Sequence, residues 1–497
     1  LLLAGGKTLS MRFGKRSQHS IWDPCRFTSA SLDGACKSFN VPKRFRKLPG
    51  EISHLEVQHA VDTGTFPQWL EENRESVVKY NKRDVTALAW LVHRLRVSMK
   101  AMGVEVLDKL TVGSCVFEQW SKDVGRRYSL RTRVGGATAS ADGKKLPKRD
   151  RKKSTKQAAG KGRDRFQYRV AVWSPKTEEE DTLIRGSIVG GRTEVLRAGP
   201  LNEPVLYREP MRAVDFHSMY PYCMCKEGNV YPFGDPQDLN WEAERDGGGG
   251  EEAFLDVYEE VDILSQPNFV VYPGRGETLD WKFRGEHAAP VSMNSIDLAE
   301  LRACGGTATV REGSRVLRWA KKVEGVEIFA VIKTWYVEKE KQDAYKNAGD
   351  ERYNVAYRNI IKLWLNNLWG KFAQRNFNEG QTEVIRSSKD ADNFEQTHTA
   401  VDYLPARATW CIGKGDQEWD PTRAMPVQLA SFVLSYARRE LLGVIKGLSA
   451  YGPSERPLYC DTDSVMGPAS AVDRYEREHP EMFHERLGGL DEEWAEE

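Results

Sequence analysis

The sequence lacks any apolar run near the ~20 residues that a helix needs to cross a bilayer, so no membrane partner is expected. It also lacks net charge, because 73 Lys and Arg stand against 72 Asp and Glu, and only local charge can indicate a partner. None of the eight cysteines forms a paired C-x-x-C set of the zinc type, which favours free thiols in a reducing compartment. Residue 1 is Leu and no signal peptide pattern follows, so we expect a fragment that begins inside a larger protein.

The length of 497 residues is enough for two to four domains. Charge of one sign is concentrated in two segments of the chain. Residues 144–165 hold eleven Lys and Arg against two Asp, without apolar periodicity, so this segment cannot fold alone. It is either a nucleic-acid-binding arm or targeting signal, or a solvated insertion in a linker. The last stretch, 471–497, has the opposite sign, with ten acidic residues against three Arg.

The stretch from Tyr459 to Ser464 (Y-C-D-T-D-S) is predicted to be the tip of a strand-turn-strand hairpin, because apolar residues flank it on both sides. Asp461 and Asp463, at i and i+2, point the same way along a strand, and a tight turn crowds them further. Close like charges are costly, and a divalent cation is the usual remedy. A solvated Asx-type turn is the alternative for this motif alone.

Two further stretches combine regular structure with polar side chains. An apolar run enters Asp215, and Pro221 lies where a strand would give way to the next element. Farther along, four residues recur at i, i+4, i+7 and i+8 and therefore share one face of a predicted helix: Lys362, Asn366, Trp369 and Gly370.

These three stretches resemble motifs A, B and C of family B DNA polymerases (D-x-x-S-L-Y-P, K-x-x-x-N-S-x-Y-G-K and Y-x-D-T-D-S), in the family's order. The resemblance implies a DNA-directed DNA polymerase that transfers dNTPs to a hydroxyl with two Mg²⁺ ions, for which Mn²⁺ can substitute. The 151 positions from Asp215 to Asn366 leave space for an inserted subdomain, as in the protein-primed members of viruses, mobile elements and mitochondria. The implied partners are primer-template DNA, dNTPs and a terminal priming protein.

The resemblance also implies roles for the matched residues. Asp215 and Asp463 would be catalytic metal ligands, with the carbonyl of Phe216 as a further ligand and Asp461 in a supporting role. Tyr220 would be the steric gate that rejects a 2′-hydroxyl. The other nucleotide-binding residues would be Arg358 and Lys362 at the triphosphate, and Asn366, Trp369 and Gly370 under the nascent base pair. Asn367 replaces the family's Ser and Trp369 its Tyr, which predicts altered fidelity and sugar selection.

Residues 188–193 (I-V-G-G-R-T) resemble the family's Y-x-G-G segment, which joins the exonuclease and polymerase domains and helps to place the primer-template. Ile188 stands where the family has Tyr. The implied DNA-binding residues are Gly190, Gly191, Arg192 and Lys371, with Arg192 at a phosphate. An ordinary Gly-Gly hairpin is the alternative.

Tyr80 and Asp84 lie at i and i+4 in a helical pattern at 67–98, and they resemble the third 3′–5′ exonuclease motif, Y-x-x-x-D. Tyr and Asp one turn apart occur on many helices, so the motif is weak without its place upstream of motif A. The family's first two exonuclease motifs are not found, and one Asp cannot hold two metal ions. Exonuclease activity is therefore not expected.

The implied fold class is α/β (α+β). Residues 1–139 are assigned to a remnant of an RNase H-like exonuclease domain, and 140–166 to a basic flexible linker. Residues 167–497 are assigned to a polymerase domain, with a palm of antiparallel sheet and helices, helical fingers at about 336–375, and the thumb missing. Helices are predicted at 31–39, 67–98, 295–303 and 427–448, and strands at 255–264, 270–271 and 328–335, with strands and loops at 381–410.

Two other functions are weighed against a polymerase. The main one is an inactive or weakly active remnant that only binds nucleic acid; intact Asp215, Asp461, Asp463 and Lys362 favour activity instead. The other is a reverse transcriptase, whose catalytic turn usually pairs adjacent aspartates, whereas Thr462 separates them here.

Overall fold

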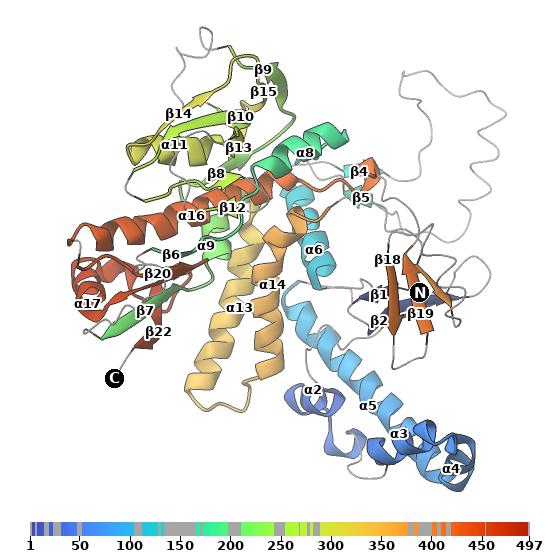
Figure 1. The fold of residues 1–497 in the computed structure, drawn as a ribbon. Helices are drawn as coiled ribbons and strands as arrows, with labels where there is room; N and C mark the ends of the chain where they lie inside the picture. Colours follow the sequence, from blue (N-terminus) through green and yellow to red (C-terminus); the bar gives the residue numbers. More distant parts are fainter. Residues whose placement is uncertain are drawn as a thin grey trace, which may run out of the picture.

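The computed structural model describes residues 2–4, 7–13, 19–22, 31–46, 52–103, 112–127, 131–133, 166–168, 172–196, 210–242, 254–267, 269–275, 279–281, 289–375, 382–385, 400–404, 409–413, 419–452 and 454–495. These residues form helices and antiparallel sheets (Figure 1), which confirms the predicted α/β (α+β) class.

The helices on which the architecture depends are α2 (Leu32–Ser38), α3 (His54–Asp62), α4 (Phe66–Glu72), α5 (Arg74–Ala101), α6 (Val112–Arg127), α8 (Glu178–Gly186), α9 (Met219–Cys225), α11 (Ser295–Ala303), α12 (Gly325–Ile328), α13 (Ala330–Asn347), α14 (Val355–Phe372), α16 (Val427–Ser449) and α17 (Ala469–Glu478). Side-chain caps define several starts: Ser31 caps α2, Asn294 caps α11 and Asn354 caps α14.

The strands outside the two main sheets are β1 (Leu2–Ala4), β2 (Lys7–Phe13), β3 (His19–Trp22), β4 (Arg131–Arg133), β5 (Phe166–Tyr168), β8 (Val230–Pro232), β11 (Gly274–Arg275), β12 (Leu279–Asp280), β16 (Lys322–Glu324), β17 (Thr382–Ile385), β18 (Ala400–Leu404) and β19 (Thr409–Gly413). The strands predicted between 381 and 410 are confirmed.

The first main sheet has five antiparallel strands in the order β22 (Leu490–Ala495), β7 (Met211–Phe216), β21 (Ser464–Pro468), β20 (Tyr459–Asp461) and β6 (Thr193–Val195). The hairpin predicted around the Y-C-D-T-D-S stretch is therefore confirmed as β20–β21. Ser464 lies opposite Asp215 in the ladder between β21 and β7. This pairing brings Asp463, the residue before Ser464, close to Asp215, although the two are far apart in sequence. We call this sheet the catalytic sheet.

The second main sheet has the order β13 (Val291–Asn294), β10 (Leu255–Ser265), β15 (Arg315–Trp319) and β9 (Gln237–Asn240), and β14 (Thr307–Val310) also pairs with β10. Helix α11 packs on this sheet. The strand predicted at 255–264 and the helix predicted at 295–303 are both confirmed. The sheet is formed within the span between motifs A and B, where an inserted subdomain was predicted.

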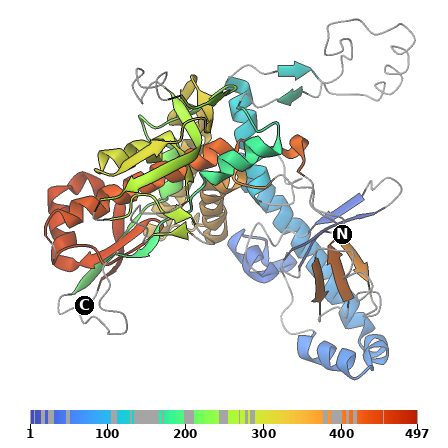
Figure 2. The same cartoon turned by 45° about the horizontal axis from the view of Figure 1, so that its top comes forward.

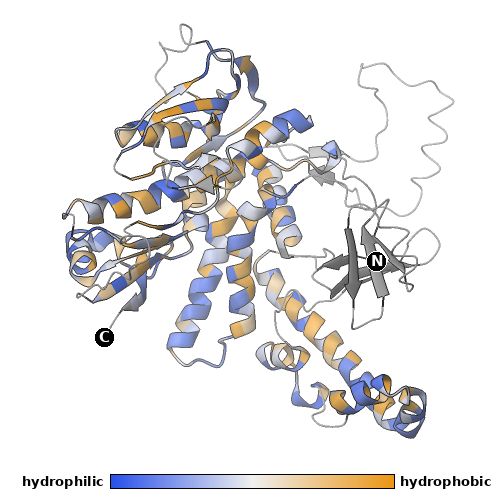
Figure 3. Ribbon diagram, viewed as in Figure 1, coloured by the Kyte–Doolittle hydropathy of each residue, from blue (hydrophilic) through white to orange (hydrophobic). Residues whose placement is uncertain are grey.

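Helix α16 lies between the two sheets, as Figures 1 and 2 show from two directions. Its mostly apolar sequence, visible in Figure 3, packs against α9, α14 and α17 and against both sheets. Buried Phe432, Val433 and Ile445 anchor it in the core, which confirms the predicted helix at 427–448.

Helices α13 and α14 pack along each other and run away from α16, beside the catalytic sheet (Figure 1). Trp335 and Trp364 meet edge to face, with ring centroids 5.3 Å apart. The outer half of α13 is hydrophilic (Figure 3), because one of its sides faces a cavity instead of the core.

The structure corrects two predictions made from the sequence, at 328–335 and at 270–271, and also shows how the acidic stretch near the C-terminus is folded. Residues 328–335 belong to α12 and α13, because their apolar positions bury one helix face. Val270 and Val271 are buried in a bend beside β10, so their burial does not arise from strand pairing. The acidic stretch 471–497 is folded as far as residue 495: it continues α17 and adds β22 to the edge of the catalytic sheet.

The remaining features add less to the site. The helical pattern at 67–98 is divided between α4 and α5. The basic segment 144–165 and most of the low-complexity stretch 242–252 lie outside the described residues. Among the described cysteines, the following are not in disulfides: Cys36, Cys115, Cys223, Cys225, Cys304 and Cys460. Within the described parts, no helix is both long and apolar enough for a membrane crossing.

Candidate active site

The catalytic sheet presents two aspartates at one end. Asp215 is in β7 and half-buried, and Asp463 is in the turn between β20 and β21. The amide of Phe216 donates a hydrogen bond to the carbonyl of Asp463 (2.9 Å), which fixes the two segments to each other. Thr462 has a φ of +58°, a left-handed conformation that tightens the turn.

The electrostatics of these carboxylates indicate a site that needs positive charge. Burial, the Asp463 carboxylate and Glu493 raise the pKa of Asp215 to about 7, against the opposing effect of Lys362. Burial, Asp461 and Glu493 raise the pKa of Asp463 to about 6. Without a cation, therefore, the folded protein resists the ionisation of both groups near neutral pH.

Strand β22 contributes acidic residues that the sequence analysis did not assign to the site. Asp491 lies opposite Asp215 in the ladder between β22 and β7 and lies 3.3 Å from Nε2 of His217. Glu493 is close enough to raise the pKa of both Asp215 and Asp463. From Leu490 to Trp494 (L-D-E-E-W) three consecutive acidic residues stand between two apolar ones, so the segment lacks the alternation that would have indicated a strand.

Asp461 is exposed and points elsewhere. Its Oδ1 accepts hydrogen bonds from Thr193 Oγ1 (2.8 Å) and Thr462 Oγ1 (3.1 Å), and Tyr459 donates to its Oδ2 (3.3 Å). These bonds hold the carboxylate at the outer side of the turn, in keeping with the supporting role given to it above.

The opposite wall of the site is lined by cations from α13 and α14. Lys362 and Arg358 lie one turn apart on α14, as predicted. Lys339 on α13 adds a cation that the sequence analysis did not assign to the site, because it lies outside the three matched motifs. Lys339 Nζ lies 3.0 Å from Asp343 Oδ2, and Arg358 Nε pairs with Asp343 Oδ1.

The rings of Tyr220 and Trp369 meet where α9 approaches α14, with centroids 4.7 Å apart. Burial and the nearby Asp463 raise the pKa of Tyr220 to about 12, so its hydroxyl stays protonated. Asn366 is exposed on the same side of α14 as Lys362.

These groups surround one cavity of about 1160 Å³. Most predicted catalytic and nucleotide-binding residues line it: Asp215, Phe216, Tyr220, Arg358, Lys362, Asn366, Trp369 and Asp463. His484 and Arg486, from the segment before β22, line it as well. A cavity with carboxylates on one wall and cations on the other has the charge pattern needed for a polyphosphate held with metal ions.

Beside the hairpin, the segment with Gly190 and Gly191 is fixed by hydrogen bonds at both ends. The carbonyl of Arg192 accepts a hydrogen bond from the amide of Thr462 (2.7 Å), and Arg438 donates to the carbonyl of Val189. A Cβ on Gly191 would lie 2.7 Å from Thr462 Oγ1, whereas Gly190 has nothing within 4 Å. Gly191 thus permits a close approach to the catalytic turn.

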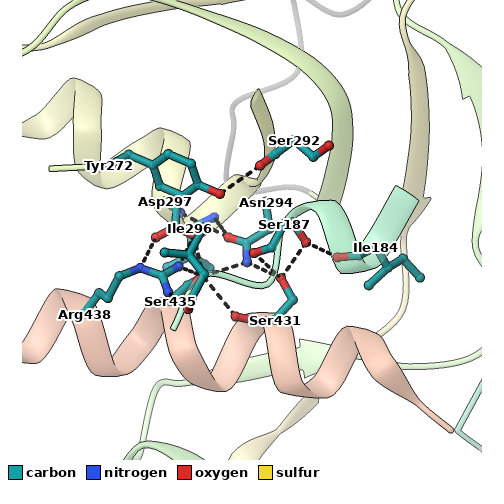
Figure 4. Close-up of polar contacts among 11 residues, drawn as sticks. Ile184, Ser187, Tyr272, Ser292, Asn294, Ile296, Asp297, Ser431, Ser435 and Arg438 are labelled. Carbon is teal, nitrogen blue, oxygen red and sulfur yellow. Dashed lines mark hydrogen bonds and ion pairs between the residues drawn. The ribbon is translucent and has the colours of Figure 1, made fainter. Parts of the chain in front are cut away.

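A buried polar network supports this segment from α16 and α11 (Figure 4). Arg438 Nη2 lies 2.6 Å from Asp297 Oδ2, with both side chains under 10% exposed. Ser435 donates to the same carboxylate, and Asn294 donates to Ser435 (2.7 Å) and Ser431 (2.8 Å). The network joins the second sheet to α16 and the glycine segment.

Three predicted residues are placed differently from expectation. Arg192 is only 3% exposed; its guanidinium pairs with Glu194 (2.7 Å) and lies over Trp281, so its side chain is not available to a DNA phosphate. Lys371 bonds to Gln374 at the end of α14 and does not line the cavity. Gly370 is on the exposed side of α14.

Tyr80 and Asp84 lie one turn apart on α5, away from this cavity. Asp84 Oδ1 is buried and has no hydrogen-bond partner among the described residues. Whether the pair belongs to an exonuclease remnant stays a prediction.

Within the described residues, no three His, Cys, Asp or Glu side chains converge as a ready-made metal site. The raised pKa values of Asp215 and Asp463 nevertheless fit divalent cations, because a cation would relieve their repulsion. Mg²⁺ is commonly held by one or two carboxylates plus waters and substrate phosphates, so two carboxylates suffice.

Sequence comparison shows that the chain is similar to known DNA polymerases. The family model for DNA polymerase type B, organellar and viral, matches residues 5–247, which include motif A. The DNA-directed DNA polymerase of Enterobacteria phage PRD1 is 25% identical over 312 residues, which cover 59% of this chain and 45% of that protein. The chain thus spans less than half the length of this curated relative.

The fold is similar to solved structures of Phi29 DNA polymerase. The ternary complex with primer-template DNA and incoming nucleotide has a TM-score of 0.60 at 14% identity, over 98% of this chain and 68% of that one. The complex with single-stranded DNA has a TM-score of 0.55 at 14% identity, over 98% and 67%. At this identity the likeness is evidence for the fold alone.

Proposed function

We propose that the chain is a DNA polymerase of the organellar and viral type B family, whose family model matches residues 5–247, and that it catalyses DNA-directed transfer of deoxynucleotides to a primer hydroxyl. The observation that carries this proposal is the meeting of three groups at one cavity: Asp215 and Asp463 from neighbouring segments of the catalytic sheet, and Lys362 from α14. In this reaction the hydroxyl oxygen bonds to the α-phosphorus, the bond to the bridging oxygen breaks, and pyrophosphate leaves.

Asp215, Asp463 and the carbonyl of Phe216 would hold two divalent cations, Mg²⁺ or Mn²⁺ in its place. Bound there, such cations lower the pKa of the attacking hydroxyl and neutralise the leaving oxygens. The protein's own contribution is to hold the carboxylates, through the bond from Phe216 to Asp463 and the tight turn at Thr462.

The cations Lys362, Arg358 and Lys339 would bind the triphosphate, since all three line the cavity opposite the carboxylates. The ring of Tyr220, supported by Trp369, would lie under the sugar and exclude a 2′-hydroxyl. Asn366, Trp369 and Gly370 would form the floor under the base pair. Gly190 and Gly191 would meet the DNA through their backbone, since the Arg192 side chain is engaged elsewhere.

The proposed partners are primer-template DNA, dNTPs and a terminal priming protein. The second sheet and α11 form a unit with a core of their own, which suits an inserted subdomain that grips such a protein. We assign 1–139 to an exonuclease-like remnant, 140–166 to a linker and 167–497 to the polymerase domain, with α13 and α14 as fingers. Replication of a viral, mobile-element or mitochondrial DNA is the proposed setting.

A primer-extension assay tests the proposal. The purified chain, a labelled primer on a template, dNTPs and Mg²⁺ should give products longer than the primer, and EDTA should abolish them. Asp463→Asn, purified identically, controls for a contaminating polymerase. Equal extension by wild type and variant, or none by wild type with either a DNA or a protein hydroxyl, would contradict the proposal.

A further inference from the structure

Asp343 occupies an unusual place in the cavity, between two of the three cations proposed to bind the triphosphate. Its Oδ2 lies 3.0 Å from Lys339 Nζ, one turn earlier on α13, and its Oδ1 pairs with Arg358 on α14. A single carboxylate therefore joins the two helices and engages two cations at once.

Exposure limits how these cations can be used. The Lys339 side chain is only 10% exposed, and the side chains of Asp343 and Arg358 are 29% and 26% exposed. All three nevertheless line the cavity that holds Asp215 and Asp463. A ligand in the cavity would therefore meet Lys339 and Arg358 as cations that Asp343 already engages.

The carboxylate is also firmly anionic. Burial acts to raise the pKa of Asp343, but the hydrogen bonds from Arg358 and Lys339 outweigh it and leave the pKa below the usual range. Two cations with a shared counter-ion are less attractive to a second anion than two free cations, because part of their potential is already neutralised.

We propose that Asp343 is an internal competitor of the triphosphate: it holds Lys339 and Arg358 while the site is empty, and nucleotide binding exchanges its carboxylate for phosphate oxygens. The inference rests on the proposed function of the cavity. In this proposal Asp343 helps to set the affinity for the nucleotide, although its carboxylate repels the phosphates. The exchange lets a buried lysine avoid an unpaired charge in the empty protein.

Binding of inorganic tripolyphosphate, followed by isothermal titration calorimetry with Mg²⁺ and without DNA, tests the exchange apart from catalysis. Asp343→Asn removes the charge and keeps the shape, so its Kd should fall by about threefold or more. If this variant does not fold, Asp343→Ser has the same expectation. An unchanged or higher Kd in the folded variant would overturn the proposal, because Asp343 would then only position the cations.

Glu340→Gln is the matched control. Glu340 is exposed on the same helix, lines the same cavity, and makes no ion pair within the described part of the chain. The Glu340→Gln substitution removes the same charge without freeing a cation, so its effect on Kd should be less than half that of Asp343→Asn. An equal effect would mean that Asp343→Asn acts only through the overall electrostatic potential of the cavity, and it would overturn the exchange.

A double-mutant cycle gives the sharpest outcome. Lys339→Gln should weaken tripolyphosphate binding more in the Asp343→Asn background than in wild type, because wild type must first break the ion pair. Equal losses would contradict the exchange, and so would a wild type that does not bind tripolyphosphate. Binding with the expected cycle but without primer extension would instead refute the polymerase proposal alone.

Discussion

The rings of Tyr220 and Trp369 lie 4.7 Å apart between centroids, with their planes tilted by 44°. Tyr220 is in the first turn of α9, within motif A, and Trp369 is near the end of α14. The contact joins the segment that holds Asp215 to the helix that holds Lys362. A change in either ring should therefore alter the wall of the nucleotide cavity without touching the carboxylates.

Tyr220→Ala should raise incorporation of ribonucleotides relative to deoxyribonucleotides by about tenfold or more, because the ring would no longer exclude a 2′-hydroxyl. The measurement is the ratio of kcat/KM for a matched ribonucleotide and deoxyribonucleotide. Tyr220→Phe keeps the ring and should keep most of the discrimination. An unchanged ratio in Tyr220→Ala would mean that this residue is only a core aromatic.

Asp463→Asn should lower single-nucleotide incorporation by at least about a hundredfold, because it removes a carboxylate proposed to hold the cations. Its thermal midpoint should not fall, since the change also removes like-charge repulsion with Asp215. Asp461→Asn is the control: its carboxylate is exposed and bonded to Thr193, so the loss should be smaller. More than a tenth of wild-type incorporation by Asp463→Asn would refute its role.

The raised pKa values of Asp215 (about 7) and Asp463 (about 6) predict a pH-dependent stability without metal. Unfolded aspartates ionise near pH ~3.9, so between pH ~4 and ~7 the folded protein binds more protons than the unfolded chain. Stability should therefore fall as pH rises through this window. Mg²⁺ should reverse the loss mainly above pH ~7, where both groups are ionised.

Differential scanning fluorimetry in EDTA measures this effect. Relative to wild type, Asp215→Asn should flatten the decline between pH 5 and 8, with a gain on the order of 2 °C at the upper end. It should also reduce the stabilisation by Mg²⁺. Parallel curves for wild type and variant would show that the pKa of Asp215 is not raised in the folded protein.

The catalytic hairpin and the motif B helix could be predicted from sequence because local pattern and fold agree there. Apolar residues on both sides of Asp461 and Asp463 indicate two strands joined by a turn, and the helical recurrence from Lys362 to Gly370 defines one helix face. Local patterns alone could not predict that residues of these segments line one cavity. That prediction depended on the match to three family motifs in their usual order.

Other parts could not be predicted because their signals are not local. The apolar, β-branched run at 328–335 favours a strand in isolation, and only packing against α6 and α14 makes it a helix. Strand β22 has acidic residues at an edge where strand and solvated tail look alike. Glu493 was missed for the second reason, and Lys339 and Asp343 were missed because they lie outside the three matched motifs. Arg192 was misplaced because its burial depends on Trp281, which is distant in sequence, as well as on Glu194.

Arg438→Met should destabilise the protein, because it leaves Asp297 buried with its charge unpaired, a loss of about 3–5 kcal/mol for buried pairs. We expect a thermal midpoint lower by on the order of 5 °C. Adding Asp297→Asn should restore part of the loss, since the stranded charge is then gone. A double variant no more stable than Arg438→Met would contradict this account.

Gly191→Ala gives the most direct test of how the glycine segment positions the catalytic turn. The new Cβ would lie 2.7 Å from both Oγ1 and Cγ2 of Thr462 and 3.0 Å from its Cβ, so the turn holding Asp463 must move. Thr462 is short and β-branched, so its side chain cannot rotate away from the new Cβ. Its amide is also hydrogen-bonded to the carbonyl of Arg192, the residue after Gly191.

A displacement on the order of 1 Å between reacting groups can cost about a hundredfold in rate, so single-nucleotide incorporation by Gly191→Ala should fall by about tenfold or more. Gly190→Ala is the matched comparison: nothing lies within 4 Å of a Cβ at this position, so it should lose clearly less incorporation than Gly191→Ala. Thr462→Gly, which suits the φ of +58° and removes the clashing side chain, should restore part of the activity of Gly191→Ala. If Gly190→Ala and Gly191→Ala lose activity equally, the pair serves chain flexibility or DNA contact, and the clash with Thr462 is not what makes Gly191 necessary.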